Sequence, residues 1–280
     1  MPEQTPPSSQ NTSVQRLQPS LLLAVEKTCP EHGPYTAKAV NLTPAGDLGM
    51  FDAPVYSRCP VCMANAEAKR AEDERQRESV ARKHKIERLL SRSGIPLRFQ
   101  DRTFANYRTE SVGQRIAMAA CRGYAENWKQ TAERGTSLVM TGGPGTGKTH
   151  LACAIAHHVA TAEMACAVFV STTDMLRHIK STYRKDSART ERQALDDFIT
   201  EPDLLIVDEI GVQVGSDHEK LLLFEILNER YQWMKPTILI SNLNAAELEA
   251  YLGHRAMDRY RECGTVIPFD WKSHRGADAS

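Results

Sequence analysis

A glycine-rich stretch that matches the pattern GxxxxGK[ST] constrains the fold of this chain more than any other feature of its sequence. It follows a short apolar run at residues 138–140 and precedes apolar residues at helical spacing. Glycines let a backbone wrap around a phosphate with its N–H groups pointing inward, and the start of a helix favours an anion. This context predicts a nucleotide-phosphate site formed by Gly142, Gly143, Pro144, Gly145, Thr146, Gly147, Lys148 and Thr149.

The residues around this loop indicate how a nucleotide would be handled. We expect Lys148 to reach the β- and γ-phosphates and the Thr149 hydroxyl to bind Mg²⁺. Asp208 follows the apolar run 204–207 and would therefore lie at the carboxyl end of a buried strand, where it would hold Mg²⁺ through water. Its neighbour Glu209 is placed to polarise a water molecule for attack on the γ-phosphate, which favours ATP hydrolysis over phosphoryl transfer. A solvated loop acid is the alternative interpretation of Glu209.

Short apolar runs alternate with helical patterns from about residue 97 onward. Strands are expected at residues 138–140, 167–170, 204–207 and 237–240, a fifth at 266–269 lies at a sheet edge because of its proline, and helices are expected at 174–183 and 218–234. Such alternation is typical of a parallel sheet with helices on both faces. The predicted class is therefore α/β.

Two features further along the chain extend the predicted site. Asn242 follows the fourth strand, where its amide could orient the attacking water or the γ-phosphate, although asparagine is also common at helix starts and turns. Arg255 and Arg259 are four residues apart and so share one face of a helix. An arginine donated across a subunit interface can stabilise the charge of the transition state, whereas a helix with surface salt bridges is the alternative.

Two cysteine-containing pairs near the N-terminus have the spacing of a metal site. Cys29 and His32 form a C-x₂-H pair, and Cys59 and Cys62 form a C-x₂-C pair. Three thiolates and one imidazole suit a structural Zn²⁺, and four protein ligands leave no open position for catalysis. Residues 33–58 are expected to form a ribbon or hairpin between the pairs. Unrelated free thiols are the alternative, and the other four cysteines read as small buried residues.

Charge and the length of the apolar runs limit the class of protein that the chain can be. The 280 residues carry 35 basic and 35 acidic side chains, so net charge gives no argument for nucleic-acid or membrane binding. No apolar run is long enough to span a membrane and no signal peptide is recognisable, so we expect a cytosolic protein.

The expected divisions are a disordered tail at 1–20, a zinc module at 21–62, a long charged helix at 63–93, an ATPase domain at 94–276 and a tail at 277–280. The helix is either a solvated spacer or a binding face.

Taken in order, the glycine-rich loop and the segments LLIVDE, ILISN and LGHRAMDR resemble the AAA+ ATPases of the helicase-loader branch. This branch holds the DnaC-type replicative helicase loaders and their relative, the IstB transposition helper. The entry segment GIPLRFQDRTFANY and the ending FDWKSHR, with Trp271, Ser273 and Arg275, share the resemblance, which covers about residues 94–276. It implies an AAA+ fold, the sensor role for Asn242, and an arginine finger in the MDR triplet at Arg259, with Arg255 as the less favoured candidate.

The resemblance also implies partners. Only 21 residues follow Arg259, too few for a helical lid or a DNA-binding domain of the initiator type, which fits the loader branch. ATP-bound subunits of the family assemble head to tail and grip single-stranded DNA. Basic residues neutralise phosphates and tyrosine stacks on bases, so candidate DNA contacts are Lys180, Tyr183, Arg184 and Lys185; a solvated basic face is the alternative. The best-known loaders contact helicase through a helical N-terminal region, and a zinc module departs from that pattern.

Three functions remain in competition at the level of sequence. The first is a helicase loader that uses ATP and Mg²⁺ as a switch while it docks on a hexameric replicative helicase. The second is an IstB-type helper that assembles on duplex DNA and recruits a transposase. The third is an adaptor in which ATP only stabilises the fold. The Asp208–Glu209 pair and the candidate finger disfavour the adaptor, and the zinc module and long helix favour the loader.

Overall fold

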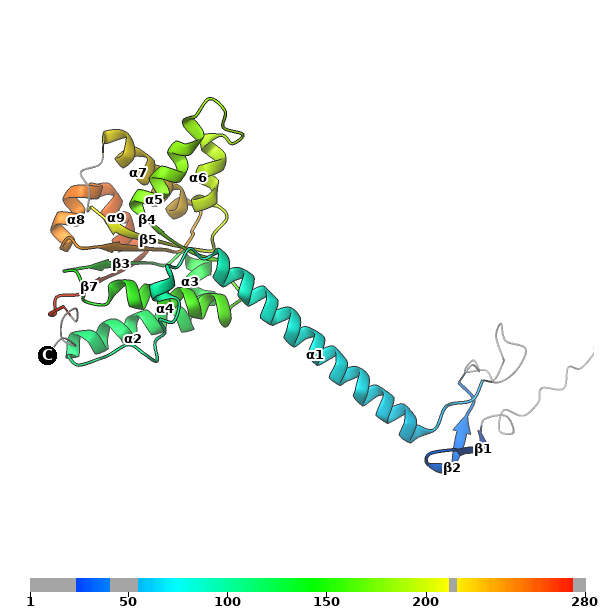
Figure 1. Ribbon diagram of the computed structural model, residues 1–280. Coiled ribbons are helices and arrows are strands. Elements are labelled where there is room, and N and C mark those ends of the chain that lie inside the picture. The colour runs from blue at the N-terminus through cyan, green and yellow to red at the C-terminus, as the bar shows by residue number, and fades with distance from the viewer. Residues whose placement is uncertain (1–23, 41–54, 212–215, 274–280) are drawn as a thin grey trace, which may run out of the picture. The chain divides into compact units, whose positions relative to one another are not determined.

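The computed structural model describes residues 24–40, 55–211 and 216–273 (Figure 1). The expected tails at 1–20 and 277–280 lie outside the described residues, as does Arg275. The chain divides into two compact units, and the division falls between Val80 and Ala81, within helix α1 (Pro60–Arg92). Among the described residues, no helix has both the length and the apolar character that a membrane span requires.

The first unit contains an antiparallel hairpin of β1 (Ala24–Cys29) and β2 (Gly33–Lys38). Cys29 pairs with Gly33, and Gly33 has a φ of +77°, so the turn between them needs a residue that tolerates left-handed backbone. A further bridge joins Ala39 to Tyr56. The hairpin therefore surrounds the first cysteine pair instead of lying wholly between the two pairs as expected, because the C-P-E-H segment itself forms the turn.

Helix α1 begins three residues before the predicted start at residue 63. Pro60 suits the first helical position because that position has no helical partner for an N–H, and the earlier start brings Cys62 into the first turn. None of its residues is buried. Its stability therefore comes from good helix formers and local charge pairs such as Glu72 with Arg75.

The second unit is built on a parallel sheet with the order β4-β5-β6-β3-β7. Its strands are β3 (Ser137–Thr141), β4 (Ala167–Ser171), β5 (Leu204–Ile210), β6 (Thr237–Ser241) and β7 (Gly264–Pro268). All five predicted strands are present, and the fifth lies at an edge as its proline indicates. Successive strand residues face opposite layers, so Leu204 and Ile206 belong to one core and Leu205 and Val207 to the other.

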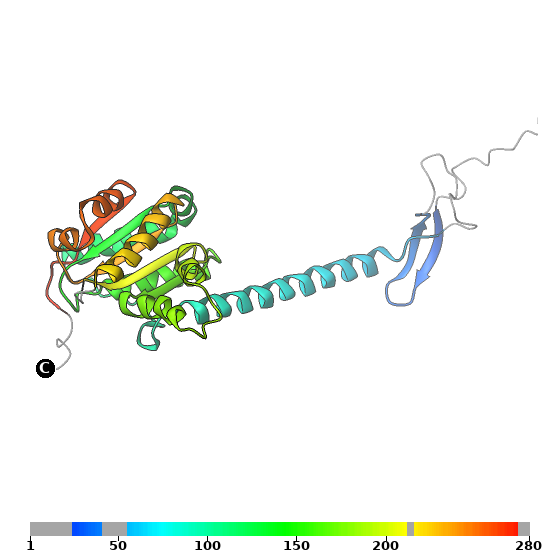
Figure 2. The ribbon, with the colours of Figure 1, turned by 90° about the horizontal axis from the view of Figure 1, so that it is seen from above.

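Helices cover both faces of this sheet (Figure 1). One layer holds α2 (Val112–Glu126), α3 (Trp128–Arg134) and α4 (Lys148–Thr161). The other holds α5 (Thr172–Lys180), α6 (Glu191–Ile199), α7 (Asp217–Gln232), α8 (Ala245–Leu252) and α9 (His254–Glu262), and faces the viewer in Figure 2. Short 3₁₀ turns lie at Leu97–Phe99 and Ser181–Tyr183. The predicted α/β class with a three-layer parallel sheet is confirmed, and no helical lid follows β7 in the part of the chain that the structure describes.

The segment after α1 is fixed to the edge of this sheet. The N–H of Phe169 in β4 donates to the carbonyl oxygen of Ser93 at 2.7 Å. Gly94 has a φ of +68°, and a Cβ atom there would lie 2.4 Å from the carbonyl oxygen of Phe169. Only glycine permits this close approach of the two backbones.

Candidate nucleotide site and zinc site

Lys148 is the first residue of α4 and lies at the centre of the glycine-rich loop. Its Nζ donates to the carbonyl oxygens of Gly142 and Gly143, at 2.5 and 2.8 Å, and to Oδ1 of Asn242 at 3.1 Å. The residue is only 5% exposed. The ammonium group of a buried lysine is thus held among loop oxygens, next to the Asn242 side chain that follows β6.

Thr149 and Asp208 come together from α4 and β5. The hydroxyl of Thr149 donates to Oδ2 of Asp208 at 3.0 Å. Burial raises the pKa of the Asp208 carboxyl, while the N–H of Glu209, the Thr149 hydroxyl and the charge of Lys148 act in the opposite direction. A hydroxyl and a carboxylate are hard oxygen donors of the kind that Mg²⁺ prefers, so this pair fits the cation predicted there.

Glu209 occupies an irregular position at the end of β5. The pairing of β5 with β6 shifts between Val207 and Ile210, and Glu209 has a φ of +61° and an exposed side chain. Its N–H donates to Oδ1 of Asp208 at 2.7 Å. This bulge turns the Glu209 side chain out of the sheet, beside the Asp208 carboxylate.

Two buried hydroxyls that no sequence motif singles out hold the backbone on either side of Glu209. Thr172 donates to the carbonyl oxygen of Asp208 at 3.0 Å, and Ser241 donates to that of Ile210 at 2.6 Å. These contacts join the start of helix α5 and the end of strand β6 to the bulge in β5. Only their proximity in the fold reveals them, because serine and threonine are common at strand ends.

The two candidate finger residues differ in their surroundings. Arg255 and Arg259 both lie on α9, as predicted, and Arg255 is exposed. Arg259 is half-buried, donates to Oδ1 of Asn228 and lies over the ring of Tyr231, with 5.3 Å between the guanidinium carbon and the ring centroid. The side chain of Arg259 is thus oriented by α7, and that of Arg255 points to solvent.

The candidate DNA contacts lie at the end of α5 and in the turn that follows. Lys180 forms an ion pair with Glu219 at 2.5 Å, and the Tyr183 hydroxyl lies 3.0 Å from Nε2 of His218. Arg184 and Lys185 are exposed. Two of the four predicted residues therefore contact α7, and the two others present their charges to solvent.

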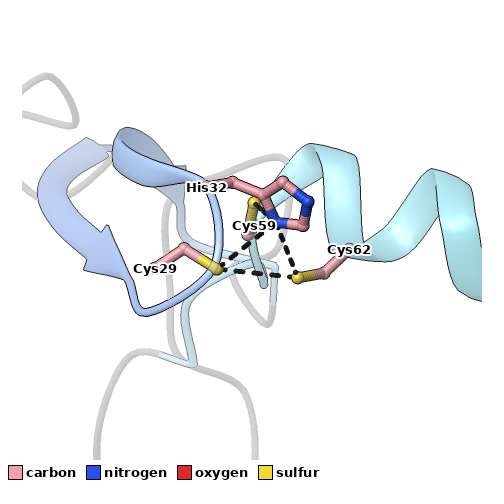
Figure 3. A group of neighbouring side chains, drawn as sticks. All are labelled: Cys29, His32, Cys59 and Cys62. Carbon is pink, nitrogen blue, oxygen red and sulfur yellow. Dashed lines mark hydrogen bonds between the residues drawn. The ribbon is translucent and has the colours of Figure 1, made fainter.

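Cys29, His32, Cys59 and Cys62 converge in the first unit (Figure 3). Their ligand atoms all lie within 4.8 Å of one another. Nδ1 of His32 is 3.6, 3.8 and 3.3 Å from the sulfur atoms of Cys29, Cys59 and Cys62. The Cys29 and Cys62 sulfur atoms are 3.6 Å apart.

These separations match the edges of a coordination tetrahedron. Zn–S bonds of ~2.3 Å place the sulfur atoms of a tetrahedral site ~3.8 Å apart. The 3.6 Å between the Cys29 and Cys62 sulfur atoms is close to that edge and far from the ~2.0 Å of a disulfide, and Cys29, Cys59 and Cys62 form no disulfide among the described residues. The donor set and its geometry therefore fit the zinc ion that the spacing predicted.

The thiols of this cluster already differ in proton affinity. The backbone N–H of Glu31, followed by the side chain of His32, lowers the pKa of Cys29 to about 6. The Cys29 sulfur, followed by burial, raises the pKa of Cys62 to about 12. One thiolate is thus favoured at neutral pH without metal, and a bound cation would favour the others.

Four features together define a P-loop ATP-binding protein of the AAA+ class. They are the five-stranded sheet, the phosphate loop that follows β3, the acidic pair after β5 and the polar amide after β6. The chain matches the IstB-like ATP binding protein family over residues 71–260. It belongs to this family, in its DnaC-like part. The zinc cluster lies outside the matched residues.

Curated relatives agree with this assignment. The replicative helicase loader DnaC of Escherichia coli (strain K12) is 36% identical over 192 residues, which are 68% of this chain and 76% of DnaC. The DnaC of Buchnera aphidicola subsp. Baizongia pistaciae is 34% identical over 202 residues, 71% of this chain and 80% of the relative.

Solved structures agree in fold. The crystal structure of the DnaC helicase loader has a TM-score of 0.56 at 23% identity and covers 62% of this chain and 99% of its own. The structure of DnaI has a TM-score of 0.55 at 20% identity and covers 67% of this chain and 100% of its own.

Proposed function

We propose that this protein is an ATP-dependent replication protein that binds a replicative helicase and loads it onto single-stranded DNA, with ATP hydrolysis as the assembly and release switch. The observation that carries the proposal is the joining of Lys148 to Asn242 and of Thr149 to Asp208 in a chain 36% identical to a replicative helicase loader. An adaptor that used ATP only for stability would not need a carboxylate such as Glu209 beside that pair.

Each residue of the site has its own role in the proposed ATP hydrolysis. The N–H groups of residues 145–149, after Pro144, hold the phosphates and Lys148 neutralises them, while Thr149 and Asp208 would hold Mg²⁺, which screens phosphate charge. Glu209 takes a proton from the attacking water, since its carboxylate is exposed beside Asp208. Asn242 orients the water or the γ-phosphate from the neighbouring strand.

The proposed assembly places a nucleotide between two subunits. Arg259 of one subunit would stabilise the negative charge that develops on the γ-phosphate held by the next. Its contacts with Asn228 and Tyr231 reduce the number of conformations that its long side chain samples. Arg255, which lacks such contacts, is the second candidate.

The proposed DNA contact lies in the segment after α5. Arg184 and Lys185 are exposed and can neutralise backbone phosphates directly, and Tyr183 can stack on a base. Lys180 would have to leave Glu219 first. We therefore assign the larger share of DNA affinity to the two exposed cations.

The proposed zinc site gives the first unit its structure. The described part of this unit, with one short hairpin and no buried residue in α1, has too small an apolar core to fold stably by itself. Zinc would join the turn at Cys29 and His32 to the first turn of α1 at Cys62. The resulting module, together with α1, is the surface that we propose for the helicase.

The decisive experiment is light scattering after size exclusion of this protein mixed with the replicative helicase of its own host or phage, in ATP and in ADP. A stoichiometric complex that ATP favours supports the loader. Absence of a complex in both nucleotides contradicts it and favours the second candidate, the transposition helper, to which the family match also points. Assembly of filaments on duplex DNA would then be measured.

A further inference from the structure

The segment after β7 runs along the phosphate loop. β7 pairs with β3 up to Pro268 opposite Thr141, and the N–H of Phe269 donates to the Thr141 carbonyl oxygen at 2.7 Å. A Cβ atom on Gly142 would lie 2.2 Å from the carbonyl oxygen of Phe269. The first glycine of the loop is therefore in backbone contact with this segment.

Trp271 contacts the far end of the same loop. Its indole Nε1–H donates to the carbonyl oxygen of Thr146 at 2.9 Å. The ring is half-buried, lies 4.9 Å from the ring of Phe269, and packs where a Cβ on Gly113 of α2 would be 3.1 Å away. The indole is thus fixed from two sides while its only donor points at the loop.

The contact between Trp271 and the Thr146 carbonyl also affects the orientation of the next N–H group, because the peptide bond between Thr146 and Gly147 is planar and trans. The C=O of Thr146 and the N–H of Gly147 belong to one peptide unit and point in opposite directions. A donor that holds the Thr146 oxygen outward therefore directs the Gly147 N–H to the other side of the loop. Among the described residues, no acceptor takes that N–H.

Gly147 has the freedom to rotate this peptide, so an external restraint matters. Its φ is +95°, and a Cβ there would lie 2.8 Å from the ring of Tyr107. Glycine populates many backbone conformations at similar cost, so the orientation of its N–H is weakly specified by the loop alone.

We propose that Trp271 is a positioning residue of the nucleotide site, whose indole N–H holds the Thr146–Gly147 peptide in the orientation that aims the Gly147 N–H at a bound phosphate. The inference rests on the proposed ATP binding. Trp271, which lies outside the loop, thus supplies part of the order that the loop needs before it can bind a phosphate.

The test is the affinity for a fluorescent ATP analogue and for ADP, measured with the full chain and Mg²⁺. Trp271→Phe keeps an aromatic ring against Phe269 but removes the donor, and we expect both affinities to fall roughly five- to tenfold. Trp233→Phe is the matched control, because Trp233 is 67% exposed at the end of α7 and should leave affinity unchanged.

The thermal midpoint without nucleotide separates positioning from folding. It should be similar in wild type and Trp271→Phe, while the rise caused by ADP is smaller in the variant. Equal affinities of the two proteins would overturn the role of the indole donor. Lost affinity only in Trp271→Leu, with Trp271→Phe normal, would overturn it as well, since packing would then be sufficient. A wild type that binds no nucleotide would instead refute the proposed function, and the inference with it.

Discussion

The Nζ atom of Lys148 lies 3.1 Å from the Oδ1 atom of Asn242, although 94 positions separate the two residues in the sequence. The contact joins the start of α4 to the end of β6, across β3. Because the lysine ammonium and the amide lie within hydrogen-bond distance of each other, a phosphate that binds Lys148 must also come close to Asn242.

Substitutions of these two residues should separate binding from hydrolysis. Lys148→Ala removes charge-assisted hydrogen bonds worth about 2 to 3 kcal/mol, so ATP affinity should fall roughly 30- to 150-fold. Asn242→Ala should leave ATP affinity nearly unchanged and slow hydrolysis by roughly 10- to 100-fold, since it removes one polar group near the transferred phosphate. Equilibrium binding and single-turnover hydrolysis check both, and normal turnover in Asn242→Ala would refute the sensor role.

Asp208→Asn should make the nucleotide-free protein more stable at neutral pH. Burial raises the pKa of Asp208, so its charged form is disfavoured in the folded state and costs stability above that pKa. The cost disappears as the pH falls through the raised pKa and the carboxyl becomes neutral. The gain in denaturant midpoint should therefore be present at pH 7 and vanish in acid.

Glu209→Gln is the matched control for that measurement. Its side chain is exposed, so the midpoint should hardly change, while hydrolysis is lost and ATP binding remains. Asp208→Asn should instead lose Mg²⁺-dependent binding. A midpoint at pH 7 that falls in Asp208→Asn would contradict the assigned cost of burial.

Arg259→Ala should spare ATP binding and reduce the hydrolysis of assembled subunits by roughly 100-fold or more. Arg255→Ala is the internal comparison, because it lies one helical turn away on α9 and lacks the contact with Asn228. Mixed assemblies with Lys148→Ala subunits show whether the arginine acts in trans. If Arg259→Ala hydrolyses normally and Arg255→Ala does not, the finger is Arg255.

Arg184→Ala/Lys185→Ala should weaken single-stranded DNA binding and lower the slope of log affinity against log salt by about 1.4, because two phosphate contacts are lost. Lys180→Ala should have a smaller effect, since Lys180 is already paired with Glu219. The control is Lys129→Ala/Arg134→Ala on α3, in the opposite helix layer. Unchanged affinity at low salt in the variant that also carries Lys180→Ala would remove this segment from the DNA-binding surface.

The wild-type protein should contain about one zinc ion per chain, and Cys59→Ser/Cys62→Ser should contain none. Cys166→Ser is a suitable control because Cys166 is a half-buried cysteine of the second unit and is not one of the four residues of the cluster. A chelator should destabilise the first unit against proteolysis and leave ATP binding intact. Equal zinc contents in wild type and the double variant would exclude the site.

The elements that the sequence predicted well are those set by short-range pattern. Apolar runs of three or four residues predicted the strands, since a strand covered on both faces has no polar alternation. The C-x₂-H and C-x₂-C spacings identified the four residues that meet in Figure 3. The glycine-rich loop predicted its own position between β3 and α4.

What the sequence did not reveal depends on contacts between distant segments. The pairing of Lys180 with Glu219 and the hydrogen bonds of Thr172 and Ser241 around Glu209 require the packed fold. Arg230 is a stronger example, because an arginine in a charged helix predicts a solvated side chain. It is fully buried and donates to Thr237 and to the carbonyl oxygens of Phe198, Ile199, Pro202 and Pro236.

The contact of Ser93 and Gly94 with β4 has a practical meaning for any shortened form of the protein. β4 is an edge strand, and the N–H of Phe169 would be an unpaired donor without the Ser93 carbonyl. Open edges of this kind recruit strands from other molecules. A fragment that begins at residue 97 should therefore self-associate through β4, whereas one that begins at residue 81 retains its own edge cover and should stay dispersed.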